Sequence, residues 1–168
     1  YLETLLFQYG RYLLISSSRT FVPAHLQGIW NPYCDSPWSC GYWHNINIQM
    51  NYWLTGPTNL NELFLPFLNY TKAYMNKAKE YADNYIKNNY PLIYDKEGNN
   101  GWIVNTGCSA FYIEGFERVC HSGPGTGGFT ALMFLLKLAS WSLSPSHRLK
   151  IINSDFLTCS ATRDFIFA

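Results

Sequence analysis

The sequence predicts an all-α domain with long loops rich in aromatic residues. Residues 1–15 and 59–87 carry apolar side chains at three- and four-residue spacing, which is the period of a helix with one buried face. Strand-like and helix-like segments do not alternate, so a parallel α/β sheet is not expected. The 168 residues are enough for one domain with its own core.

The first expected helix covers about residues 1–15. Three serines end its pattern, and we expect its apolar face to be buried. The residues on this face are Leu2, Leu5, Leu6, Tyr9, Tyr12 and Leu13. From residue 20 to about 44, prolines and glycines lie among aromatic residues, which predicts a long ordered loop.

Two helices are expected in the middle of the chain. A short one begins within residues 45–53 and ends before the Gly-Pro pair that follows. The other has the clearest start in the sequence, where Asn59 can cap the N-terminus while Glu62 reaches back to the Asn59 amide. The apolar spacing continues this helix to about Lys87.

Two glycine-rich segments follow. Residues 98–101 predict a turn, and residues 123–128 are expected to open a last helix at about Phe129. The second segment lacks the Lys-Ser or Lys-Thr pair of a phosphate-binding loop. We therefore interpret it as a tight turn that lines a pocket.

Composition and charge exclude several functional classes. The chain is 48% hydrophobic and 14% charged, as in globular proteins, so disorder is not expected. Its net charge of +1 provides no field that would attract nucleic acid, and no apolar run approaches the roughly 20 residues that span a bilayer. We expect neither nucleic acid nor a membrane as a partner, and the oligomeric state is not predictable.

The cysteines and histidines do not predict a metal or any other cofactor. The five cysteines are odd in number and scattered, although Cys34 and Cys40 are near enough in sequence to pair. There is no Cys-x-x-Cys motif and no pair of histidines at metal-ligand spacing.

Aromatic residues make up 18% of the chain. A thick core explains them, and so does a sugar-binding cleft in which rings stack on a pyranose while amides bind its hydroxyls. The segment 44–53 alternates amide and apolar residues, and its Asn45 and Asn47 are two residues apart. An extended backbone would point both amides into one cleft, whereas the alternative is that they form turns.

Four stretches, in this order, resemble the catalytic domain of glycoside hydrolase family 95, the inverting α-L-fucosidases. They are LFQYGRYLLISSSR (residues 6–19), LQGIWN (26–31), NINIQMNYW (45–53) and TNLNEL (58–63). GWIVNTG (101–107) and SGPGTGGFT (122–130) are similar to later stretches of bacterial members. The resemblance covers about residues 1–134.

The resemblance implies an all-α fold that is part of an (α/α)6 barrel. Residues 1–134 would form the N-terminal part of the catalytic domain, and residues 135–168 a divergent tail produced by a frameshift or a truncation. The full-length protein would be secreted or attached to the cell surface, although the sequence shows no such signal.

The resemblance also implies an enzyme that removes terminal α-linked L-fucose, or a related sugar such as L-galactose, from a fucosylated glycan or plant polysaccharide. In the family, the residues that match Asn45 and Asn47 serve the water-activating side of the reaction. On chemical grounds, the side chains expected to contact the sugar are Gln27, Trp30, His44, Trp102 and Asn105.

The position of the general acid leaves a second hypothesis open. Counting from the glycine-rich segment places the acid of the family at Leu136, and leucine cannot donate a proton. The Asp that supports the amide base in the family would lie beyond residue 168. The alternative is therefore a non-catalytic, truncated remnant that binds sugar weakly or is inactive.

Overall fold

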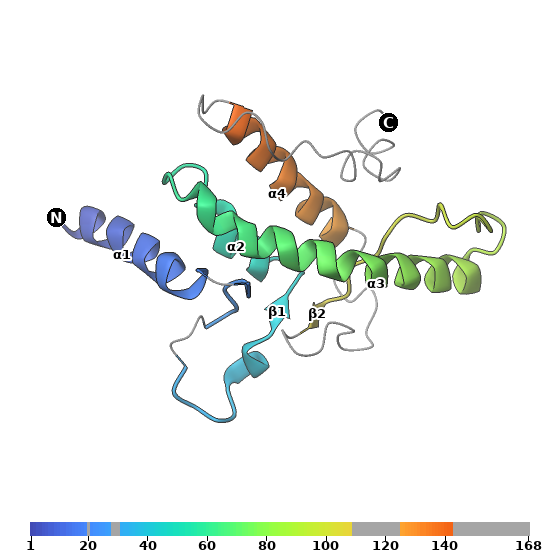
Figure 1. Ribbon diagram of the computed structural model, residues 1–168. Helices are drawn as coiled ribbons and strands as arrows, with labels where there is room; N and C mark the ends of the chain where they lie inside the picture. Colours follow the sequence, from blue (N-terminus) through green and yellow to red (C-terminus); the bar gives the residue numbers. More distant parts are fainter. Residues whose placement is uncertain (20, 28–30, 109–124, 143–168) are drawn as a thin grey trace.

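The computed structural model describes residues 1–19, 21–27, 31–108 and 125–142, which are mostly helical (Figure 1). The helices are α1 (Leu2–Ser17), η1 (Pro37–Cys40), α2 (Asn47–Trp53), η2 (Asn61–Phe64), α3 (Leu65–Asn89) and α4 (Gly125–Ser142), where η marks a 3₁₀-helix. The prediction of an all-α fold is confirmed. Trp30 and most of the expected tail, residues 143–168, lie outside the described residues.

Two short strands join the long loop to the segment before α4. β1 (Tyr42–Trp43) pairs antiparallel with β2 (Gly107–Cys108), so that Trp43 lies opposite Gly107. A Cβ atom on Gly107 would lie 3.3 Å from the carbonyl oxygen of Tyr42, which is closer than such contacts normally are. The absence of a side chain at Gly107 therefore allows these segments to approach.

The core is an aromatic stack between α2, α3 and α4. The ring of Phe67 in α3 lies parallel to Tyr52 of α2 and Phe134 of α4, with centroid distances of 5.0 and 5.6 Å. Phe64 packs edge-on against Phe67 at 5.4 Å. In Figure 1, α3 crosses the centre of the molecule with α2 and α4 beside it. The core interpretation of the aromatic residues is confirmed for these four rings.

The start of α3 differs from the prediction, although its end, at Asn89, lies two residues from the expected position. Asn59 has a positive φ of 56° and does not cap the helix. The chain first forms η2, and α-helical geometry begins at Leu65, directly before Pro66. Proline lacks an amide hydrogen and clashes with the carbonyl four residues earlier, so it is accommodated only in the first turn of an α-helix.

The prediction of a helix at the N-terminus is confirmed, but the expectation that its apolar face is buried is wrong. Leu6 and Tyr9 are 61% and 54% exposed, and Leu14 is the only buried residue of α1. Only the C-terminal part of α1 approaches the other described helices, as Figure 1 shows. Periodicity identifies a face that can be buried, whereas burial itself requires a neighbouring element.

Other local expectations are partly confirmed. Gly98 and Gly101 have positive φ angles of 86° and 75°, as a turn at residues 98–101 requires. The last helix begins at Gly125 rather than at Phe129, so part of the glycine-rich segment is helical instead of forming a turn. Cys34 and Cys40 are free thiols and do not pair. Within the described ranges, no helix is long and apolar enough to cross a membrane.

A buried hydrogen-bond chain joins α1, α2 and η2 through Tyr52. The amide of Ala24 donates to the Tyr52 hydroxyl oxygen at 2.7 Å, and the Tyr52 and Ser18 hydroxyl oxygens are 2.6 Å apart. Because the Ser18 hydroxyl donates to the carbonyl of Leu63 at 3.1 Å, it must accept from Tyr52. Burial raises the pKa of Tyr52 to about 12, so the phenol keeps its proton.

Removing this hydroxyl should destabilise the fold. Tyr52→Phe leaves the buried amide of Ala24 and the hydroxyl of Ser18 each without one partner, and we expect a loss of about 1–3 kcal/mol in the free energy of unfolding. Urea unfolding followed by circular dichroism measures this loss. The control is Tyr9→Phe on the exposed face of α1, which should change stability by less than about 0.5 kcal/mol. Equal effects of the two substitutions would contradict this result.

Candidate functional site

Asn45 lies on the turn that leads from β1 into α2, and Asn47 lies at the start of α2. Residues 44–46 form the turn and Asn47 is the first residue of α2, so the extended backbone that would have aligned the two amides is absent. Asn45 is exposed and Asn47 is partly exposed. Neither side chain hydrogen-bonds to another residue in the part of the chain that the structure describes. Both amides are therefore accessible to a ligand.

His44, directly before these amides, is buried and held by three neighbours. Its Nδ1 lies 2.8 Å from the carbonyl oxygen of Asn105 and its Nε2 lies 2.5 Å from the hydroxyl of Tyr70. A carbonyl only accepts, so Nδ1 carries the hydrogen, and Nε2 of the neutral ring accepts from Tyr70. The amide of His44 donates to the carbonyl of Thr106 at 2.8 Å.

Asn105 is also buried, with 1% of its surface exposed. Its Oδ1 accepts from the hydroxyl of Tyr74 at 2.9 Å, and its backbone amide donates to the same hydroxyl at 3.1 Å. The polar atoms of His44 and Asn105 are thus bonded to the protein itself. His44 and Asn105 therefore hold the turn that carries Asn45 in place through buried hydrogen bonds.

Burial lowers the pKa of His44 to about 4, although the hydrogen bond to Asn105 acts in the opposite direction. Between pH 6.5 and 4 the unfolded chain therefore binds a proton that the folded chain excludes. The contribution of His44 to stability should be constant above pH 7 and fall by an amount on the order of 3 kcal/mol as the pH drops to 4. Urea unfolding at pH 7, 5.5 and 4 measures this slope.

His25 is the control for this pH dependence. Burial also lowers the pKa of His25, but this side chain is only partly buried. His25→Gln should therefore keep most of the acid destabilisation. A free energy of unfolding that stays constant from pH 7 to 4 in the unmodified chain would contradict the buried, neutral state of His44.

Among the predicted sugar-contacting residues, His44 and Trp102 lie together, whereas Gln27 belongs to a different cluster. His44 and the partly exposed Trp102 line a cavity of about 10 Å³, which holds about one water molecule and is too small for a sugar ring. Gln27 lies in a different cluster, where its Oε1 accepts from the thiol of Cys40 at 3.6 Å. Asn31 donates to the same sulfur at 3.2 Å.

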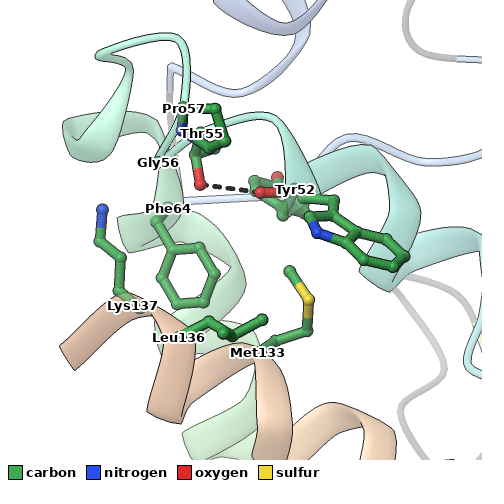
Figure 2. Close-up of a pocket in the computed structure, with 9 residues that line it drawn as sticks. Tyr52, Thr55, Gly56, Pro57, Phe64, Met133, Leu136 and Lys137 are labelled. Carbon is green, nitrogen blue, oxygen red and sulfur yellow. Dashed lines mark hydrogen bonds between the residues drawn. The ribbon is translucent and has the colours of Figure 1, made fainter. Parts of the chain in front are cut away.

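A larger pocket of about 280 Å³ lies between the end of α2 and α4 (Figure 2). Its walls include Trp53, Phe64, Met133 and Leu136, and they are mainly apolar. Thr55, also in the wall, donates its hydroxyl to the carbonyl of Tyr52 at 2.7 Å, which is the dashed line in Figure 2.

Sequence reasoning missed Lys137, which borders this pocket. Lys137 is 6% exposed, and its Nζ donates to the backbone and side-chain oxygens of Asn61. Nζ also lies 5.3 Å from the centre of the Phe64 ring. Burial lowers the pKa of Lys137 to about 8, with the charge of Glu62 opposing the shift. The signal in the sequence was a single cation within the apolar run 131–138.

Residues 1–128 match the model of a family described as the glycosyl hydrolase family 95 catalytic domain. The chain belongs to this family. It is 40% identical to a probable alpha-fucosidase A of Aspergillus oryzae over 77% of this chain, and 39% identical to the protein of that name in Aspergillus niger over 66%. It is 43% identical to alpha-L-fucosidase 2 of Arabidopsis thaliana over 62%. The alignments cover 17%, 13% and 11% of these three relatives.

The family 95 match includes the turn and its support. Asn45, Asn47, His44 and Asn105 all lie within residues 1–128. Leu136 and Lys137 follow the matched segment on α4, on the wall of the larger pocket. The family match therefore covers the accessible amides, whereas position 136 lies beyond it.

Proposed function

We propose that the protein to which this family 95 domain belongs hydrolyses terminal α-linked L-fucose, or a related sugar such as L-galactose, with inversion at the anomeric carbon. Its substrates are fucosylated glycans or plant polysaccharides. The observation that carries this proposal is the family match over residues 1–128, and the names of the three relatives support it. In this proposal the described helices are part of an (α/α)6 barrel, with residues 1–134 in the catalytic domain and 135–168 as a divergent tail.

Asn45 and Asn47 serve the water-activating side of this reaction. Inversion requires a group that activates water on one face of the sugar and an acid that protonates the leaving oxygen on the other. An amide oxygen accepts a hydrogen bond from water, and an amide nitrogen donates one to a hydroxyl, so two accessible amides can orient a water molecule beside a sugar. The exposure of Asn45 on the turn and the partial exposure of Asn47 at the start of α2 support this role.

The sugar-contacting residues divide into two groups. Gln27, Trp30 and Trp102 contact the sugar directly in this proposal. His44 and Asn105 act through the turn instead, because their side-chain polar atoms are bonded to Tyr70, Tyr74 and the backbone.

A second candidate function is sugar binding without catalysis. The specific observation that favours it is Leu136 at the position where the resemblance places the general acid. Removing a general acid typically lowers the rate by about 10²–10⁴-fold. A chain with leucine at this position would retain the amides for binding and lack the proton donor for cleavage.

Hydrolysis of 4-nitrophenyl α-L-fucoside tests the proposed function, because its activated leaving group depends little on an acid. We expect slow release of nitrophenol, lowered by at least about 100-fold in Asn47→Ala. Asn69→Ala changes an exposed asparagine on α3 and should leave the rate unchanged. Binding of L-fucose in calorimetry without turnover would favour the second candidate function. Absence of both turnover and L-fucose binding would contradict both candidate functions.

A further inference from the structure

Gln49 of α2 is completely buried and connects the turn to α4. Its Nε2 donates to the carbonyl oxygen of His44 at 2.6 Å and to the hydroxyl oxygen of Thr130 at 3.0 Å. The Thr130 hydroxyl in turn donates to the carbonyl of Thr126 at 3.1 Å. One side-chain amide thus joins the residue before Asn45 to Thr130 of α4, which lies 81 residues after Gln49 in the chain.

The bond to the His44 carbonyl has a direct consequence for Asn45. That carbonyl belongs to the planar peptide group that links His44 to Asn45, so fixing its oxygen fixes the orientation of the Asn45 amide nitrogen as well. The other polar atoms of His44 are held by Thr106, Asn105 and Tyr70. The bond from Gln49 restrains the rotation of this peptide plane.

The hydrogen bonding of Gln49 indicates that its role depends on the donor nitrogen rather than on the volume of its side chain. Its Oε1 is buried and has no hydrogen-bond partner among the residues that the structure describes. A buried acceptor without a partner is unfavourable, and a methionine of similar size would fill the same space without it. Packing alone therefore does not explain a glutamine here, whereas two hydrogen bonds donated from one nitrogen do.

We propose that Gln49 is a positioning residue for Asn45 and Asn47, and that it acts by fixing the peptide plane between His44 and Asn45 and tying it to α4 through Thr130. This inference rests on the proposed function for the role of the two amides in hydrolysis. It also links the water-activating side to the helix that carries position 136.

Three substitutions and one control test this role. Gln49→Met removes both donated bonds at nearly constant volume, and Thr130→Val removes the acceptor on α4. Thr71→Val is the matched control, because Thr71 is also a buried threonine that donates to the carbonyl four residues earlier, in α3. Gln49→Glu replaces the donor by a carboxylate that repels the His44 carbonyl.

The first measurement is hydrogen exchange at the two amides that bracket the turn, those of His44 and Met50. These amides donate to Thr106 and Ile46 in the folded chain. We expect exchange to be about 10-fold faster or more in Gln49→Met and Thr130→Val, and unchanged in Thr71→Val at matched global stability. Exchange as slow in both variants as in the control would overturn the proposal.

The second measurement is the pH dependence of this exchange in Gln49→Glu between pH 5 and 7.5. A buried carboxyl has a raised pKa, and its protonated form donates to the His44 carbonyl, so the ratio of the exchange rate in Gln49→Glu to the wild-type rate at the same pH should fall toward one on acidification. His44, with Tyr70 on its Nε2, is neutral in this range, and Lys137 lies seven residues beyond Thr130 on α4. A ratio to the wild-type rate that stays high at every pH would overturn the donor role.

The third measurement is turnover of 4-nitrophenyl α-L-fucoside. Gln49→Met should lower kcat by about 10–100-fold with little change in KM, because misplaced amides weaken catalysis more than binding. A kcat equal to that of Thr71→Val would overturn the role in hydrolysis. If the unmodified chain shows no turnover, or Asn47→Ala leaves it unchanged, the proposed function fails, and exchange at His44 and Met50 still decides whether Gln49 positions the turn.

Discussion

Replacing Leu136 by glutamate should raise the turnover of an unactivated fucoside, such as methyl α-L-fucoside, by about 10²–10⁴-fold. Leu136 is 47% exposed and lines the pocket beside Trp53 and Met133, so a carboxyl group fits there without entering the core. The apolar neighbours favour the protonated form that a general acid requires, whereas the cation of Lys137 in the same pocket wall opposes it. Chromatographic measurement of released L-fucose determines the gain.

The matched control for this substitution is Leu132→Glu. Leu132 lies on the same helix and is 45% exposed, but it does not line the pocket. We expect no gain in turnover from Leu132→Glu. If Leu136→Glu folds and performs no better than this control, position 136 is not the place of the general acid.

Phe67→Ala should lower the free energy of unfolding by about 3–5 kcal/mol, the largest stability effect that we expect. Phe67 is 1% exposed and lies between the rings of Tyr52 and Phe134, so its removal leaves a cavity where α2, α3 and α4 meet. Urea unfolding measures the loss. Phe21→Ala, at a side chain that is 89% exposed, should change stability by less than about 0.5 kcal/mol. A small effect at Phe67 would contradict the position of the core.

The sequence predicted the helices well where local spacing decides them. The end of α3 differs from the prediction by two residues, because apolar spacing continues until the last turn. The start of α3 was mistaken because the Asn59 capping pattern competes with the restriction that Pro66 imposes. The burial of α1 was not predictable, since it depends on which elements lie beside the helix.

The residues of the candidate site are a prediction from the sequence, whereas its local geometry could not be predicted. The dense amides of residues 44–53 point to Asn45 and Asn47, but the backbone conformation there depends on distant partners. Asn105 holds His44 from 61 residues away, and Thr130 holds Gln49 from 81. The structural role of His44 likewise becomes visible only when Tyr70 and Asn105 are placed beside its ring.

The hydrolysis of α-L-fucosyl fluoride, followed by proton NMR, tests most directly the claim that this chain carries the water-activating amides while position 136 lacks the acid. Fluoride leaves without protonation, so Leu136 does not block this reaction. We predict that the unmodified chain releases β-L-fucose first and that Asn47→Ala does not accelerate the reaction above buffer. Release of α-L-fucose first, or equal rates for the two proteins, would contradict the claim.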